Sequence, residues 1–172
     1  MDDGLTHALQ SPPDYSSSFT ERVQIINQQV SKIIGVKSIH DNDMNYRAAQ
    51  RISVCFNNQE ELVDSGDISA IYDMSIFISS KGHFYTYSLR QLGDPTFDFI
   101  SIGLPQPKSV WNQLPESKTS MKLVQSKIES VMKNNLYILI KGKILEIVIL
   151  DKFTMLDGKP ATVFELLFSE VD

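Results

Sequence analysis

The sequence predicts an α+β fold, in which a single antiparallel sheet of about six to seven strands packs against two amphipathic helices. Three observations indicate this class. Two long segments carry apolar residues at helical spacing, one segment of about a dozen residues is apolar at every second position and mostly polar between, and short turns join the predicted strands. Strands joined by short turns pair antiparallel, because a parallel return needs a long crossover. With 172 residues, the chain has the length of one domain.

The N-terminal part is divided into a leader and the start of the domain. Residues 1–17 are polar and rich in Pro and Ser, and they predict a flexible leader in front of a single domain at 18–172. Ser18 followed by Glu21 fits a capping box for a helix over 19–34. The apolar stripe of that helix recurs at steps of three and four: Phe19, Val23, Ile26, Val30 and Ile33.

The central part of the chain predicts strands. After a polar connection at 36–50, a strand is expected at 51–56. The clearest signal lies at 68–79, where apolar residues occupy every even position. Turns at Lys81-Gly82 and Gly93-Asp94-Pro95 then predict strands at 83–92 and 97–102.

The C-terminal part predicts a second helix and further strands. A helix is expected at 116–134. Strands are expected at 136–141, at 144–156 and, after an Asp-Gly hairpin signal, at 161–168. The last segment also fits a helical turn.

Composition and termini point to a cytoplasmic protein. The single cysteine, Cys55, cannot form an internal disulfide and is expected to be structural. The N-terminus has no basic residue before Arg22, which is unlike a secretory signal. No uncharged apolar run approaches the length of a membrane span, so no membrane association is expected.

Common catalytic and cofactor motifs are absent from the sequence. It contains no glycine-rich phosphate loop and no Gly-x-Ser-x-Gly elbow, and its three histidines lack metal-ligand spacing, so no cofactor or metal is expected. A small enzyme would need a site assembled from scattered residues. The candidates for such a site are His40, Asp41, His83 and Tyr85, with His40 and His83 converging in one cleft.

Charge is distributed unevenly along the chain. The formal net charge is −5, and residues 1–80 hold eleven Asp and Glu against five Lys and Arg. No Lys or Arg occurs at 52–80, which we call the acidic segment. The carboxylates of this segment can stabilise the N-terminus of a helix, or they can form a surface that binds a basic partner. The predicted partner-binding residues are Asp41, Asp43, Glu60, Glu61, Asp64, Asp67 and Asp73.

Nucleic-acid binding is not expected. The one basic-biased segment, 108–143, has seven Lys and two Glu, and its lysines fit the solvated side of an amphipathic helix.

Three functional hypotheses remain. The first is a non-catalytic protein whose acidic surface binds and neutralises a basic protein, such as a toxin or secreted effector, in the manner of immunity proteins and antitoxins. The second is a dimeric, secretion-chaperone-like protein that binds an effector; the order of helices and strands looks similar at a coarse level. The third is the small enzyme with scattered His, Asp and Tyr residues.

Overall fold

A computed structural model describes residues 3–42, 47–57, 64, 72–91, 121–154 and 158–169. The described part is α+β, as the sequence predicts, with a mostly antiparallel main sheet. The strand expected at 97–102 lies outside the described residues.

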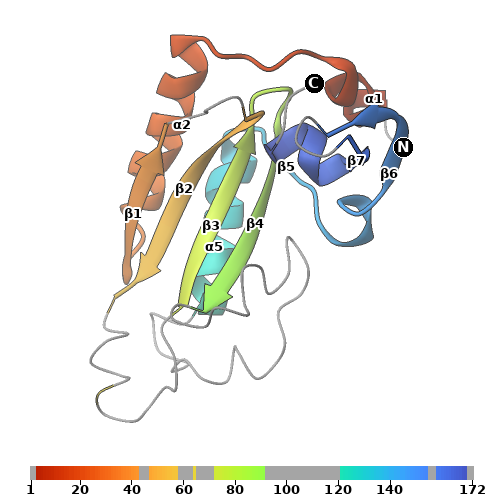
Figure 1. The fold of residues 1–172 in the computed structure, drawn as a ribbon. Coiled ribbons are helices and arrows are strands. Elements are labelled where there is room, and N and C mark those ends of the chain that lie inside the picture. The colour runs from red at the N-terminus through yellow and green to blue at the C-terminus, as the bar shows by residue number, and fades with distance from the viewer. Residues whose placement is uncertain are drawn as a thin grey trace.

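In the described residues, the main sheet has five strands in the order β1-β2-β3-β4-β5 (Figure 1). The first four form an antiparallel meander, and β5 pairs parallel to β4. Their bounds are β1 Val36–Asp41, β2 Ala49–Phe56, β3 Tyr72–Ser79, β4 Phe84–Gln91 and β5 Ile138–Leu139.

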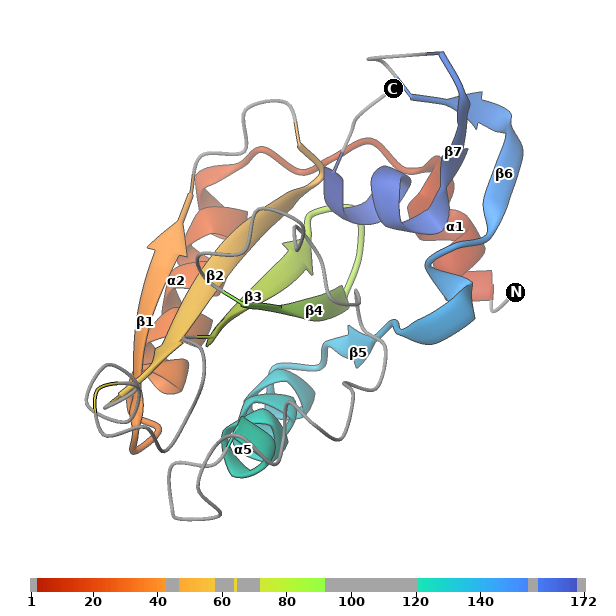
Figure 2. The same ribbon diagram turned by 60° about the horizontal axis from the view of Figure 1, so that its bottom comes forward.

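Two helices cover one face of this sheet, α2 (Ser17–Val30) and α5 (Met121–Asn134) (Figures 1 and 2). The predicted period of two places alternate strand residues under the helices, where Ile52, Ile76 and Tyr87 are buried with Val23 and Ile128. Among the described residues, this is the larger of two hydrophobic cores.

The start and end of α2 differ in detail from the prediction. The cap is Ser16, whose hydroxyl accepts a hydrogen bond from the Phe19 backbone N–H at 3.3 Å, two residues before the predicted Ser18 cap. The helix ends at Val30, and Gly35, with φ of 93°, leads the chain into β1. The polar connection expected at 36–50 therefore contains β1, an edge strand with few apolar residues.

A second, smaller unit lies beside the sheet, and we call it the C-terminal lobe. It comprises η1 (Gly142–Ile144), β6 (Val148–Phe153), β7 (Pro160–Thr162) and the π-helix η2 (Glu165–Ser169), with β6 and β7 paired antiparallel. Helix α1 (Asp3–Gln10) packs on it, and the core that they share includes Leu5, Leu9, Val163, Leu167 and Phe168.

The lobe corrects the prediction of one antiparallel sheet with six to seven strands. The chain returns from β4 to β5 through α5, and a return through a helix places β5 parallel to β4. The residues after β5 form a separate two-stranded sheet, and the ambiguous final segment is helical from Val163, with the π-helix η2 starting at Glu165.

Contacts from the lobe reach the sheet face opposite the helices. The Phe77 ring of β3 meets the Phe164 ring edge-on, with centroids 5.9 Å apart, and Phe164 lies 5.8 Å from Phe168. At this end, the sheet is therefore covered on both faces.

Candidate functional site

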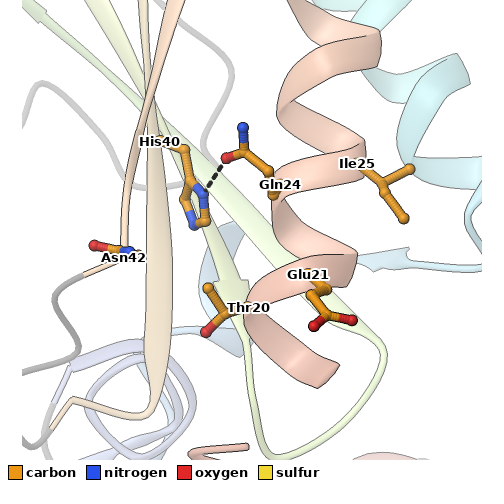
Figure 3. A pocket seen from close by; sticks show the side chains of 6 residues that line it. All are labelled: Thr20, Glu21, Gln24, Ile25, His40 and Asn42. Carbon is orange, nitrogen blue, oxygen red and sulfur yellow. Dashed lines mark hydrogen bonds between the residues drawn. The ribbon is translucent and has the colours of Figure 1, made fainter. Parts of the chain in front are cut away.

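A cavity of about 480 Å³ opens between α2 and the end of β1 (Figure 3). Its volume lies in the range of small-molecule pockets. The lining residues are Thr20, Glu21, Gln24, Ile25, His40 and Asn42.

His40 is held firmly at this cavity by amides. Its Nδ1 lies 2.7 Å from Gln24 Oε1, and its Nε2 lies 2.7 Å from Gln50 Oε1. The buried Gln50 side chain in turn donates from Nε2 to Thr20 Oγ1 at 2.7 Å. The arrangement fixes the ring between α2 and β2.

His40 and Asp41, two candidates for the hypothetical enzyme site, do not pair with each other in the contacts described. Adjacent strand residues point to opposite faces of the sheet, and His40 faces α2. Asp41 lies on the other face, where its Oδ2 accepts from Arg51 Nη2 at 3.0 Å across the β1–β2 pair. No carboxylate among these contacts orients the imidazole as a catalytic base would require.

His83 lies far from His40. Its ring stacks on Tyr137, with centroids 5.2 Å apart, beside the β3–β4 turn. The strand register places His40 of β1 directly opposite Tyr87 of β4, three strands across the sheet. His83 precedes Tyr87 by four residues. The spacings between strands and along a strand therefore put the two histidine Cα atoms about 20 Å apart. The two imidazoles therefore do not converge in one cleft.

Tyr85, the remaining candidate for an enzyme site, is buried under the helices. Burial raises its pKa well above the usual range, and the nearby Glu129 carboxylate and Tyr87 phenol raise it further. Tyr87 donates to Glu129 Oε1 at 3.2 Å and accepts from Gln125 Nε2 at 2.5 Å. This network ties α5 to β4, and burial, followed by the Glu129 carboxylate, raises the pKa of Tyr87 as well.

Three of the seven predicted partner-binding acids can be placed. Asp41 is engaged with Arg51, Asp73 is only 8% exposed, and Asp64 is exposed. Asp41 and Asp73 share the sheet face opposite the helices, about 16 Å apart by register. The other four, Asp43, Glu60, Glu61 and Asp67, lie outside the described residues.

Two further findings concern metals and membranes. Within the described ranges, no group of three or more His, Cys, Asp or Glu side chains is arranged to hold a metal ion, and Cys55 is exposed. In the same ranges, none of the helices has the length and apolar composition needed to cross a bilayer.

The sequence analysis missed a set of exposed apolar side chains on the C-terminal lobe. Each is at least 40% exposed, although Leu150 and its neighbours fit a buried strand by hydropathy alone. We call this set the C-terminal apolar surface: Ile144, Ile147, Val148, Leu150 and Phe153.

Comparison with known proteins gave no match: no family model, no curated protein and no solved structure is similar to this chain.

The hydrogen bonds around His40 yield a first testable prediction. Replacing His40 with alanine leaves the buried Gln50 amide without one of its partners, which is expected to lower the free energy of unfolding by about 1–3 kcal/mol. Urea unfolding measures the loss. The exposed His83 is the control: if H83A destabilises the protein as much as H40A, the role assigned to Gln50 is wrong.

Proposed function

We propose that this protein works by binding another protein, without catalysing a reaction, and that the partner is basic. The observation that carries the proposal is the acidic segment, where five Asp and Glu occur without a single Lys or Arg. Clustered charge of one sign speeds encounter with an oppositely charged surface by tenfold or more at low salt. Inhibition of a toxic basic partner, as immunity proteins and antitoxins achieve, is the proposed outcome of binding.

The surroundings of Asp41 and Asp73 make these two carboxylates less suited to binding a partner. Asp41 is already engaged by Arg51, and Asp73 has little exposed surface. Asp64 is exposed and follows the end of β2 at Phe56 by eight residues. Glu60 precedes it by four residues in the sequence. We therefore assign the binding role first to the exposed Asp64 and, because they are close to it in the sequence, to the other carboxylates at 60–67; Asp43 stays a predicted partner-binding residue.

The spacing of the histidines supports a role without catalysis. His40 is bound by two glutamines, and His83, about 20 Å away, stacks on a tyrosine. Neither histidine pairs with a carboxylate in these contacts. The hypothesis of an enzyme active site that combines His40 with His83 is therefore not favoured.

Reversing two charges tests the proposal. Tagged wild-type protein is used for affinity capture from its native host, beside the double variant E60K/D64K. We expect the wild type to enrich a basic protein at least tenfold more than the double variant does. A matched control, E21K/E146K, changes the net charge equally at two exposed acids elsewhere. Equal capture by all three proteins would refute the acidic-segment proposal.

A dimeric, chaperone-like protein is the second candidate function. The C-terminal apolar surface favours it, because such proteins hold their clients or their own second copy through apolar contacts. Along the chain, helix α2 precedes the four strands β1 to β4, and helix α5 follows them. This order of elements is compatible with a chaperone-like protein.

A further inference from the structure

The outward side of β6 is apolar, although it faces away from the lobe's own core. Ile149 points inward and packs with that core, opposite the buried Ala161 of β7. Val148 and Leu150 alternate with Ile149 and therefore project to the other side, where Leu150 is 79% exposed. Figure 2 shows β6 on the outer side of β7, away from the main sheet.

The size of the C-terminal apolar surface fits a protein contact. The exposed fractions of its five side chains add up to roughly 500 Å², an amount comparable with the largest apolar patch of a typical monomer. Homodimer interfaces are about 65% apolar, so a contact centred on this surface would bury about 800 Å² per copy. That is the area per partner of a standard stable interface.

The charge around the surface indicates which partner fits. Residues 143–153 carry two lysines, Lys143 and Lys152, and two acids, Glu146 and Asp151. This balance contrasts with the chain's net charge of −5 and favours neither a basic nor an acidic partner. An apolar surface with equal numbers of positive and negative charges can bind the same surface of a second copy. A two-fold contact brings that surface from both subunits together.

We propose that two copies of this chain associate through the C-terminal apolar surface, with Leu150 at the centre of the contact. The C-terminal apolar surface contains none of the carboxylates at 60–67, so self-association and binding of a basic partner are proposed as separate properties. Either one can fail without the other.

Light scattering coupled to size exclusion tests this proposal on the full chain. At protein concentrations of roughly 100 µM, we expect twice the 19.5 kDa mass of one chain for the wild type. In L150D, an unpaired charge replaces the central contact, and the dimer dissociation constant is expected to rise at least tenfold. Because Leu150 is exposed, the monomer keeps its fold, which circular dichroism verifies.

The matched control is I34D, which places the same charge at a comparably exposed isoleucine after α2, and its dissociation constant is expected to stay within twofold of the wild type. A wild-type mass of 19.5 kDa at the highest concentration would overturn the proposal. A dimer that L150D does not weaken would overturn it too, because the contact would lie elsewhere. A monomer that binds vesicles of anionic phospholipid through Leu150 would assign the surface to membranes instead.

Discussion

Replacing Phe168 with alanine is expected to lower the free energy of unfolding by about 3–5 kcal/mol, the range for removing a large buried aromatic ring. Phe168 is 2% exposed, and it belongs to η2, the element that joins the C-terminal lobe to the sheet. Its ring lies 5.8 Å from Phe164, which in turn meets Phe77 of β3. The substitution therefore opens a cavity between the lobe and the main sheet.

Urea unfolding of F168A measures this loss, with F153A as the control. Phe153 is a phenylalanine of the same lobe, but it is exposed, so F153A is expected to change the stability by less than about 1 kcal/mol in dilute protein. Equal losses in the two variants would show that η2 does not hold the lobe on the sheet.

Replacing Leu9 with alanine is expected to have the second largest effect, about 2–5 kcal/mol. Leu9 is buried in the lobe core with Leu5, and Lys81 Nζ donates to the Leu9 carbonyl oxygen at 3.4 Å. A Cβ atom added at Gly82 would lie 3.2 Å from the Ala8 Cβ, so α1 approaches the β3–β4 turn closely. A flexible leader at 1–17 would make no such contacts.

Hydrogen exchange measured by mass spectrometry locates the effect of L9A. Amides of β7 and η2 are expected to lose protection, because α1 covers the core to which they contribute. The control is Q10A, at an exposed position of the same helix. If L9A and Q10A behave alike, α1 does not stabilise the lobe.

The parts of the fold that could be predicted are those with long, regular patterns. The apolar stripe of α2 and the apolar residues at every second position of β3 each repeat over many residues, so a single interpretation fits them. The prediction failed where patterns are short. In β1, only Val36 and Ile39 are apolar, and α1 is eight residues long; both are stabilised by tertiary contacts that no local pattern records.

The candidate site was less predictable than the fold. His40 was recognised as a candidate, but its partners Gln24 and Gln50 lie sixteen and ten residues away and belong to no motif. The Asp41–Arg51 ion pair depends on the register between β1 and β2, which the sequence analysis did not predict. A list of acidic residues could not distinguish a carboxylate already engaged across strands from an exposed one such as Asp64.

The association rate with the captured basic partner, measured by stopped flow over a range of salt concentrations, tests the central claim most directly. If the carboxylates at 60–67 guide binding, the wild-type rate falls tenfold or more from low to high salt, and the rate for E60K/D64K is slow and nearly independent of salt. A wild-type rate that salt leaves unchanged, or one that the double variant reproduces, would contradict an acidic surface that binds a basic protein.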